Sequence, residues 1–491
     1  MEPRRLIWPL GGIVRDVLSG RSPCPSLNSI STPLSDRSKP SAASHAAHKT
    51  SIERIVRTMS SSPLSAAPLK PRIFPSPGFE VVDPSELIEE ETLPEYKADS
   101  YYPVYIGQIF RDRYQVVGKL GYRVTSTVWL ARDYSLISEP NDPGYAALKI
   151  YVNAYTQSNN EVAINRHINA VSAKTEYVGA KDIRKFLSSF EIKGLHGVHT
   201  CIVQQALGIT MNHLLSYLPN RTMTLEAAKP FFRKLVIGLA FLHNEAGVIH
   251  TDLQLTNLLL PVTVPYFYEE FEENECNDPV PRKIYEDRTI YYTRHMSQNF
   301  KGWPLICDFG EARFTGEHDG LIMPGPYRAP EVVMQTKWNH EADIWSFAMV
   351  AWSLVSPRTL FRGQNPETNE HHDGYLIAEL GAVLGPPPVE LMRRSRVCPI
   401  FWTENKGWKN LVPMPDTTLE NLAADIEGDD ENKEGFLRFL RRILCWLPQE
   451  RPGVGELILD PWLIKDLRFT NEQLKTSREE GEKGGQSREA D

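Results

Sequence analysis

The sequence predicts an α+β fold with two lobes, a β-rich lobe first and a helical lobe after it. Short runs of β-branched and aromatic residues are concentrated in residues 114–207, which indicates strands. Longer apolar stretches at helical spacing follow in residues 208–465. The chain has 491 residues, of which 41% are hydrophobic, so it can form two such lobes with tails at both ends.

The first lobe is predicted to be built mainly of strands. Strands are expected over residues 114–117, 126–130, 145–151 and 199–205. Gly121 marks a turn between the first two. A helix is expected over residues 160–170, because Ile164 and Ile168 recur at helical spacing after a polar start. The first lobe therefore contains one predicted helix among four strands.

The second lobe is predicted to be helical, with an insertion near its start. Helices are expected over residues 225–246, 343–354 and 435–447. Between Asn257 and Asp308 lie 50 residues, far more than a hairpin needs. Much of this segment is acidic, so residues 261–300 are predicted to form an inserted surface loop.

The two ends of the chain are predicted to lie outside the lobes. Residues 1–72 are rich in Ser, Pro and Arg and cannot bury enough apolar area to offset the entropy of ordering them, so a disordered basic tail is expected. Their composition also resembles a mitochondrial transit peptide, and Met59 offers a second start after residues 1–58. Residues 73–113 are predicted to be an extended acidic lead-in, and residues 466–491 a charged tail.

Charge and cysteine content narrow the class of protein. The net charge is −8, yet residues 1–72 carry 11 Lys and Arg against 4 Asp and Glu, so the body of the chain is strongly acidic. An acidic body favours basic protein partners over nucleic acid. The six cysteines include no C-x-x-C pair, which argues against a zinc site or disulfides and fits the cytoplasm or nucleus. A mitochondrial location is the alternative if residues 1–58 act as a transit peptide. No apolar run reaches the roughly 20 residues of a membrane span.

Lys149 lies within an apolar strand, where an unpaired ammonium group would be costly. Glu161 follows 12 residues later, at the start of the predicted helix, and is its natural partner. Such a pair can hold the α- and β-phosphates of a nucleotide. The alternative is an edge-strand lysine with its ammonium group in water.

Asp252, Asn257 and Asp308 form a second group of candidate residues. Asp252 follows the apolar pair Val248-Ile249, so its negative charge must be used or compensated. It is the candidate catalytic carboxylate, which accepts or orients the proton of a substrate hydroxyl. Asn257 and Asp308 offer the oxygen ligands that Mg²⁺ prefers. The simpler interpretations are a turn amide and a β-turn carboxylate.

Four short motifs stand in the order found in eukaryotic protein kinases. They are Ala147-Leu148-Lys149-Ile150, His250-Thr251-Asp252 with Asn257, Asp308-Phe309-Gly310, and Ala329-Pro330-Glu331. The chain resembles that family over roughly residues 110–465. The resemblance implies the two-lobed kinase fold, the use of ATP and Mg²⁺, and transfer of phosphate to a protein.

Within that family the chain resembles a divergent fungal member of the SR-protein kinases. Thr251 stands where most kinases have Arg before the catalytic Asp, as it does in that group. The segments 126–130, 155–161 and 199–203 are similar to that group as well. This resemblance implies a monomer that phosphorylates serine in basic, Arg/Ser-rich protein segments.

The resemblance also assigns positions around the site. It places the following residues around ATP: Leu120, Gly121, Val128, Ala147, Lys149, Gln205, Leu207 and Asn257. It further implies that Asp343 braces the catalytic loop, that Arg451 pairs with Glu331, and that His250 packs against Phe309 instead of handling protons.

Three positions depart from the kinase pattern. Arg123 replaces the second glycine of the usual G-x-G-x-x-G loop. Either the loop lies farther from the nucleotide, or Arg123 itself contacts phosphate. Gln254 stands where most Ser/Thr kinases have Lys, and Pro324 where they have the Thr that bonds to this Lys. Because both members of one hydrogen-bonded unit change together, the change is coherent, and it is expected to slow catalysis.

Two functions remain open from the sequence. The first is an ATP-dependent Ser/Thr protein kinase whose catalytic set is Asp252, Lys149, Glu161 and Gln254. The alternative is a catalytically weak or inactive pseudokinase that acts as a nucleotide-binding scaffold. Retention of the motif residues favours the enzyme, and the three departures favour the scaffold. Regulation by phosphorylation is not expected, because Thr315 is the only Ser or Thr between Asp308 and Glu331.

Overall fold

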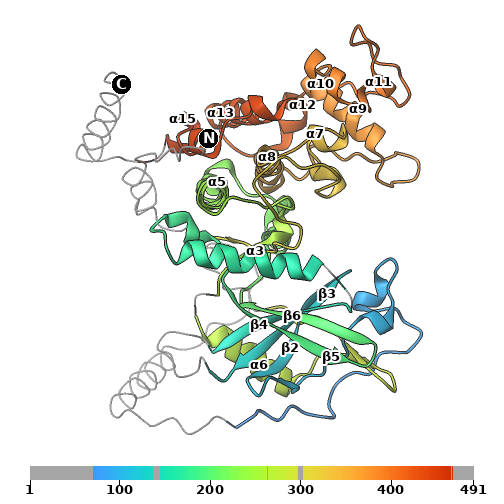
Figure 1. Cartoon of the computed structure of the whole chain (residues 1–491), viewed down its shortest axis with the longest axis vertical. Coiled ribbons are helices and arrows are strands. Elements are labelled where there is room, and N and C mark those ends of the chain that lie inside the picture. Colours follow the sequence, from blue (N-terminus) through green and yellow to red (C-terminus); the bar gives the residue numbers. More distant parts are fainter. Residues whose placement is uncertain are drawn as a thin grey trace, which may run out of the picture.

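The computed structural model describes residues 70–135, 144–153, 155, 157–262, 264–296, 302–465 and 467. It has a sheet lobe at one end and a helical lobe at the other, stacked along the long axis of the molecule (Figure 1). The predicted two-lobed α+β fold is confirmed. The predictions for residues 1–69 and for the C-terminal tail lie outside the described residues, apart from residue 467.

The sheet lobe is formed by six antiparallel strands in the order β1-β2-β3-β4-β6-β5. They are β1 (Ile109–Phe110), β2 (Tyr114–Arg123), β3 (Ser126–Asp133), β4 (Tyr145–Tyr151), β5 (Phe186–Gly194) and β6 (Gly197–Gln205). Every residue of β4 is buried, because β3 and β6 flank it. Helix α3 (Gln157–Ser172) lies between the sheet and α5 of the helical lobe (Figure 1).

The turn predicted at Gly121 is wrong. Strand β2 continues through Gly121 to Arg123, and the turn falls at residues 124–125. The register of β2 against β3 shifts between Lys119 and Gly121, so the glycine lies at a β-bulge inside the strand. The bulge lets the strand continue toward the cleft, and this places Arg123 at the tip of the hairpin.

The helical lobe contains most of the helices and the largest apolar core. Its helices are α4 (Met211–Ser216), α5 (Leu225–Ala240), α7 (Pro330–Val333), α8 (Glu341–Val355), α9 (Asp373–Leu384), α10 (Val389–Arg394), α11 (Cys398–Phe401), α12 (Leu419–Leu422), α13 (Asp430–Ile443), α14 (Val454–Ile458) and α15 (Pro461–Ile464). Helices α5 and α8 meet in the centre of this lobe, where the rings of Phe232 and Phe347 lie 6.3 Å apart. No helix in the described ranges is both long and apolar enough to cross a membrane.

The predicted helices 225–246 and 435–447 have different ends in the structure. Helix α5 gives way at Phe241 to a π-helical turn, which ends at Gly247 in the left-handed region with φ of 61°. Helix α13 begins earlier than expected, because Asp429 caps it by accepting a hydrogen bond from the backbone N–H of Asn432. It ends at Ile443, so residues 444–447 are not part of it.

Short two-stranded ladders shape the loops next to the cleft. Strand β7 (Val248–Ile249) pairs with β12 (Arg313–Phe314), and β8 (Leu258–Leu259) pairs with β11 (Leu305–Ile306). A third ladder joins β9 (Arg282–Ile284) to β10 (Thr289–Tyr291). The first two ladders hold the segments that carry the predicted catalytic and metal-binding residues.

Residues 261–262 and 264–296, the described part of the predicted 261–300 insertion, do not form the predicted surface loop. They contain helix α6 (Tyr266–Asn277) and the β9–β10 ladder, and they pack on the sheet lobe although they interrupt the helical one. The ring of Phe271 packs against Gly118 of β2, where a Cβ atom would come within 2.9 Å of it. The acidic composition was misleading because Glu272 is buried and accepts a hydrogen bond from Arg132 at 2.6 Å.

The lead-in over residues 73–113 is packed rather than simply extended. Two 3₁₀ turns, Glu89–Thr92 and Ala98–Ser100, interrupt it. Ile88 and Val104 are each only 2% exposed. Buried Lys119 of β2 pairs with Glu89 at 3.2 Å and also with Glu90. The lead-in therefore stabilises the strand that forms the roof of the cleft.

Candidate active site

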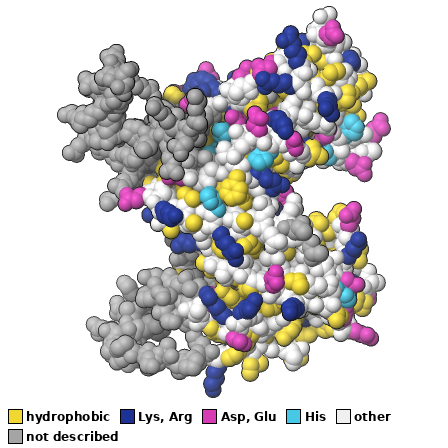
Figure 2. Space-filling model, in the orientation of Figure 1, with side chains coloured by type: hydrophobic (Ala, Val, Ile, Leu, Met, Phe, Trp, Pro, Cys, Tyr) yellow, Lys and Arg dark blue, Asp and Glu magenta, His cyan; other side chains and the backbone are white. Residues whose placement is uncertain are grey.

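A cavity of about 340 Å³ lies between the two lobes. In the space-filling view the surface is hollowed on one side between the sheet lobe and the helical lobe (Figure 2). Seven residues that were predicted to contact nucleotide or metal line the cavity: Leu120, Gly121, Val128, Lys149, Leu207, Asn257 and Asp308. Residues far apart in the sequence are thus brought to one site.

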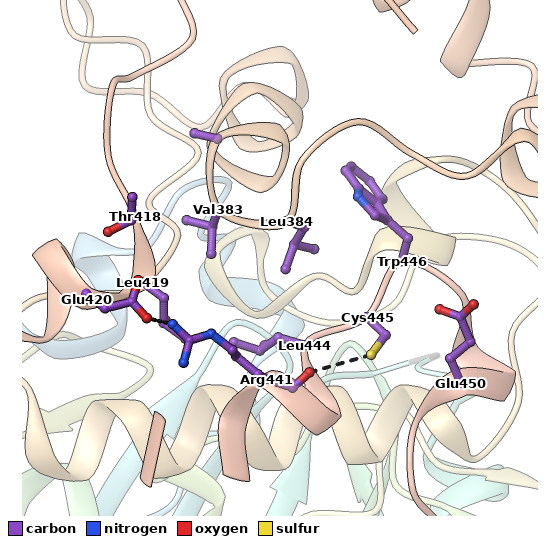
Figure 3. A pocket seen from close by; sticks show the side chains of 11 residues that line it. Val383, Leu384, Thr418, Leu419, Glu420, Arg441, Leu444, Cys445, Trp446 and Glu450 are labelled. Carbon is purple, nitrogen blue, oxygen red and sulfur yellow. Dashed lines mark hydrogen bonds and ion pairs between the residues drawn. The ribbon is translucent and has the colours of Figure 1, made fainter. Parts of the chain in front are cut away.

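A second, larger cavity of about 490 Å³ lies within the helical lobe, between α9, α12 and α13 (Figure 3). Its lining includes Leu384, Leu419, Arg441, Cys445 and Trp446. None of the predicted site residues lines it. The cavity between the lobes is therefore the candidate active site.

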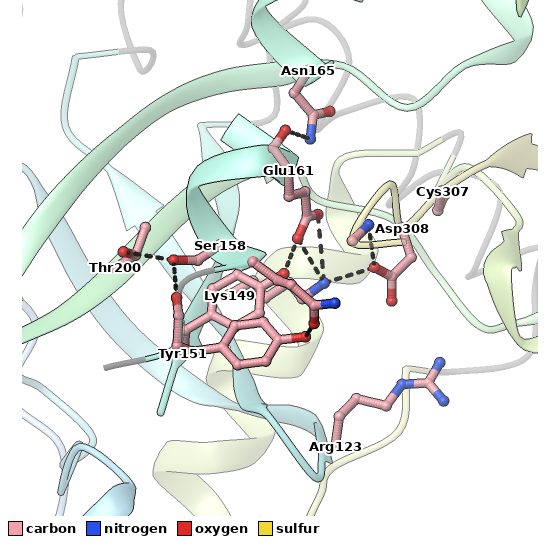
Figure 4. A network of polar contacts seen from close by, with 12 residues as sticks. Arg123, Lys149, Tyr151, Ser158, Glu161, Asn165, Thr200, Cys307 and Asp308 are labelled. Atoms are coloured by element: carbon pink, nitrogen blue, oxygen red, sulfur yellow. Dashed lines mark hydrogen bonds and ion pairs between the residues drawn. The ribbon is translucent and has the colours of Figure 1, made fainter. Parts of the chain in front are cut away.

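Lys149 of β4 is the centre of a buried ionic network (Figure 4). Its Nζ donates to Glu161 Oε2 of α3 at 3.1 Å and to Asp308 Oδ1 at 2.7 Å. The hydroxyl of Tyr151 also donates to Glu161. Burial by itself would lower the pKa of Lys149, but the two carboxylates outweigh it and raise that pKa, so the ammonium stays charged. The predicted ion pair with Glu161 is present.

Glu161 and Asp308 differ in their tendency to ionise. Burial raises the pKa of Glu161 to about 7, although Lys149 opposes this rise. Burial would also raise the pKa of Asp308, but Lys149 and then Arg123 hold it well below its ordinary value. Asp308 lies in the left-handed region with φ of 65°, where its Oδ1 accepts from the backbone N–H of Gly310 at 3.4 Å. Asp308 is therefore a fixed negative charge at the floor of the cavity.

Asp252 lies in the loop between β7 and β8 and is held by two side-chain amides. Gln254 Nε2 donates to its Oδ1 at 2.7 Å, and Asn257 Nδ2 donates to its Oδ2 at 2.8 Å. Burial raises the pKa of Asp252, and the nearby negative charge of Asp308 adds to the rise, while His250 and the two amides act in the opposite direction. A carboxylate with a raised pKa is a stronger base than an ordinary aspartate, which suits it to accept a hydroxyl proton.

Asp343 at the start of α8 braces the backbone that leads to Asp252. Its two carboxylate oxygens accept from the backbone N–H of His250 at 2.7 Å and of Thr251 at 2.8 Å. His243 also contacts it at 2.8 Å. Thr251 has φ of 65°, a conformation that these hydrogen bonds hold in place. His250 lies with its ring 5.2 Å from that of Phe309, as predicted for a packing role.

The predicted pair of Arg451 and Glu331 is present in the helical lobe. Two parallel hydrogen bonds of 2.7 and 2.6 Å join the guanidinium to the carboxylate, and both side chains are buried. Such a bidentate pair fixes orientation as well as charge. It links the segment just before α14 to helix α7.

Two of the predicted nucleotide-contacting residues do not line the cavity. Ala147 is buried in β4, two residues before Lys149. Gln205 ends β6, and its carbonyl oxygen accepts from Arg184 Nε at 3.0 Å. Ala147 is 1% exposed within β4, and Gln205 is half-buried at the end of β6.

Sequence reasoning missed several residues that line the cavity. They include Arg184, His213 and, in the later part of the insertion, Arg294–Met296. The rings of His213 and His295 lie 4.5 Å apart, and the backbone N–H of Arg294 donates to the carbonyl of Lys119 at 3.0 Å. His213 lies in α4, the first helix after β6, and this place in the chain was a usable signal, but nothing in the acidic insertion indicated that it returns to the cleft.

The oxygen atoms of Asn257 and Asp308 fit a magnesium ion. Both side chains line the cavity, and Asp308 stays ionised. In the described part of the chain no group of three or more His, Cys, Asp or Glu could hold a metal by itself. This donor set suits Mg²⁺, which is usually held by one or two carboxylates together with phosphates and water.

Comparisons with known proteins agree with this geometry. Residues 134–463 match the protein kinase domain family. A serine/threonine protein kinase of Aspergillus fumigatus is 37% identical over 403 residues, which cover 81% of this chain and 96% of that protein. The serine/threonine-protein kinase SRPK of Physarum polycephalum is 29% identical, covering 76% of this chain and 91% of that protein.

A crystal structure of a kinase domain has the same fold, with a TM-score of 0.56 at 20% identity. The match covers 74% of this chain and 99% of the other. A kinase domain implies the use of ATP, and the cavity between the lobes is where the residues for it converge. The chain belongs to the protein kinase domain family, and it is a serine/threonine protein kinase with SR-protein kinases among its relatives.

Proposed function

We propose that this kinase uses Mg²⁺ and ATP to phosphorylate serine in basic, Arg/Ser-rich protein segments. The observation that carries the proposal is the position of Asn257. Its side chain lines the cavity and also donates to the carboxylate of Asp252 at 2.8 Å. The candidate base is thereby held next to the place where the phosphates would lie.

Each residue of the site has a proposed role in the transfer. Lys149, held by Glu161, binds the α- and β-phosphates. Asp252 accepts the proton of the serine hydroxyl as the serine oxygen attacks the γ-phosphorus of ATP. The bond between that phosphorus and the β-phosphate oxygen breaks, and ADP leaves. Asn257 and Asp308 would hold the metal, which neutralises negative charge on the phosphates when it is bound.

A preference for basic substrates is supported by charge and by kinship. The chain outside residues 1–72 is strongly acidic, and one relative is an SR-protein kinase by name. Opposite charge steers a basic segment toward such a surface and raises the rate of encounter. The proposed partner is therefore a basic protein substrate. The kinase itself is proposed to act as a monomer.

A weakly active or inactive scaffold is the second candidate. It is favoured by Gln254 and Pro324, which remove the Lys and Thr expected next to the catalytic carboxylate. Loss of one stabilising donor of this kind costs on the order of 3 kcal/mol, or about a hundredfold in rate. The intact network of Lys149, Glu161 and Asp308 favours slow transfer over none.

Substrate preference is tested with two peptides of equal length. One carries Arg-Ser repeats, and the other has each Arg replaced by Ala. We expect kcat/KM to be at least about tenfold higher for the first, because opposite charges attract it. Equal values would remove the basic-substrate proposal and leave the kinase activity standing. Analytical ultracentrifugation of the purified chain measures its mass in solution and so tests whether it is a monomer.

The proposed place of action is the cytoplasm or the nucleus. The alternative is a mitochondrion reached through residues 1–58. Imaging the full chain beside a chain that starts at Met59 separates the two. Loss of a mitochondrial signal in the shorter chain would support the alternative.

A further inference from the structure

The hairpin between β2 and β3 carries an arginine into the roof of the cleft. Arg123 is the last residue of β2 and lines the cavity. Its Nη2 donates to Asn257 Oδ1 of the opposite lobe at 3.3 Å. Figure 4 shows the side chain extending below the Lys149–Asp308 network. Its charge also helps to keep the pKa of Asp308 low.

The tip of this hairpin is held in place by the lead-in segment. The hydroxyl of Tyr101 lies 3.1 Å from the carbonyl oxygen of Arg123 and 2.7 Å from that of Val124, and it donates toward both. The ring of Tyr96 lies 5.2 Å from the ring of Tyr101. A glycine-rich loop lacks such restraint, whereas this tip presents Arg123 from a fixed backbone.

Two of the other cations of the cavity are paired with carboxylates. Lys149 is held by two carboxylates, and Arg294 Nε donates to Glu275 at 2.9 Å. Arg184 Nε donates to the carbonyl oxygen of Gln205 at 3.0 Å, whereas Arg123 is the arginine that contacts Asn257. Within the described residues, Arg123 has no ion pair with a carboxylate, and its hydrogen bond goes to a neutral amide. A guanidinium has five N–H donors, so several remain for a ligand.

Among the residues that the structure describes, no cation forms an ion pair with Asp252 at the floor of the cleft. Both oxygens of that carboxylate accept from neutral amides, those of Gln254 and Asn257. Phosphoryl transfer spreads negative charge over the oxygens of the moving group and depends on nearby positive charge to stabilise it. The required charge must therefore come from elsewhere in the cleft.

We propose that Arg123 supplies this charge from the sheet lobe, in place of the lysine that Gln254 replaces. The proposal rests on the function proposed above. In it, the guanidinium donates to oxygens of the γ-phosphate, a geometry that it can meet with two parallel hydrogen bonds. Asn257 Oδ1 is both the acceptor of Arg123 and a proposed metal ligand. Arg123 would give up this hydrogen bond if Asn257 Oδ1 held a metal ion, and its guanidinium would then be free to donate to the phosphate.

The test compares Arg123→Gln with Arg111→Gln, an exposed arginine of the same lobe in the turn between β1 and β2. Arg123→Gln is expected to lower kcat by about a hundredfold. It should also weaken binding of a non-hydrolysable triphosphate analogue by about tenfold while ADP binding changes by less than about twofold, because only the γ-phosphate is affected. Arg111→Gln should match the unchanged chain in all three values.

The double variant Arg123→Gln with Gln254→Lys provides a second, positive readout. It returns a cation to the site from the helical lobe, so we expect it to recover most of the lost rate. A double variant no faster than Arg123→Gln alone would overturn the proposal, as would an unchanged ratio of triphosphate to diphosphate affinity in Arg123→Gln. The affinity ratio needs no phosphate transfer, so it tests Arg123 even if the proposed catalytic function fails.

Discussion

Gln254 donates its side-chain amide to Oδ1 of Asp252 at 2.7 Å, so the two residues form one unit at the floor of the cleft. A neutral amide fixes the orientation of the carboxylate but adds no positive charge beside it. The same position in most Ser/Thr kinases is a lysine. The unit therefore holds the proposed base in place without the positive charge that a lysine would add.

Gln254→Lys is expected to raise kcat, by up to about tenfold, because an ammonium group beside the γ-phosphate stabilises charge in the transition state. Gln254→Met is the matched control, since it has similar length and neither charge nor hydrogen bond. We expect it to lower kcat through loss of the bond to Asp252. Initial rates with saturating ATP check both. A rate for Gln254→Lys no higher than that of Gln254→Met would contradict this.

The pH dependence should follow Glu161, whose pKa burial raises to about 7. Below that pH the carboxyl binds a proton and loses its hold on Lys149, so kcat/KM for ATP is expected to fall as pH falls through about 7. The effect on folding has the opposite sign. Because the folded pKa is raised, this group stabilises the folded chain below its unfolded pKa, and that contribution is lost as pH rises through about 7. A kcat/KM profile that is flat from pH 6 to 8 would contradict the first expectation.

Helix α6 offers two neighbouring carboxylates that differ in burial. Glu272 is 1% exposed and bonds to Arg132 at 2.6 Å and to the hydroxyl of Tyr145 at 2.5 Å. Glu273 is 52% exposed and pairs with Arg72 at 2.7 Å. Glu272→Gln should lower the free energy of unfolding by about 3 kcal/mol, because it leaves the half-buried guanidinium of Arg132 without its charge partner inside the sheet lobe. Glu273→Gln should change it by no more than about 1 kcal/mol.

Urea unfolding of the two variants measures this difference. A loss for Glu272→Gln as small as that for Glu273→Gln would mean that the insertion does not stabilise the sheet lobe through this contact.

Phosphatase treatment is expected to leave activity unchanged. The segment between Asp308 and Glu331 has Thr315 as its one Ser or Thr, and Thr251 stands where a phosphate-docking arginine is common. The hydroxyl of Thr251 instead donates to the carbonyl of Glu311 at 2.7 Å. Rates before and after treatment provide the measurement, with Thr315→Ala as the control. A large loss in the unchanged chain alone would show that Thr315 is a regulatory site.

The sequence predicted those parts of the site whose partners lie on regular elements. The ion pair of Lys149 and Glu161 is predictable because one residue lies in an apolar strand and the other near the start of the next helix. Asp252 and Asn257 are close in the chain, so one short loop holds both. These relationships depend on local geometry, which composition and spacing reveal.

The insertion could not be predicted in the same way. Its acidic residues suggest contact with water, but Glu272 is buried and accepts a hydrogen bond from Arg132, which lies 140 positions earlier in the chain. Arg294 likewise reaches the cleft only because the insertion returns along β2. Such pairings arise from the tertiary fold, so spacing within the segment carries no sign of them.

The central claim is that this chain transfers phosphate with Asp252 as its base. Transfer of radiolabelled γ-phosphate from ATP to an Arg-Ser repeat peptide, compared between the unchanged chain and Asp252→Asn, tests it directly. We expect labelling by the unchanged chain and a loss of at least about a hundredfold in Asp252→Asn, with nucleotide binding retained. Equal labelling by the two chains, or labelling by neither, would contradict the claim.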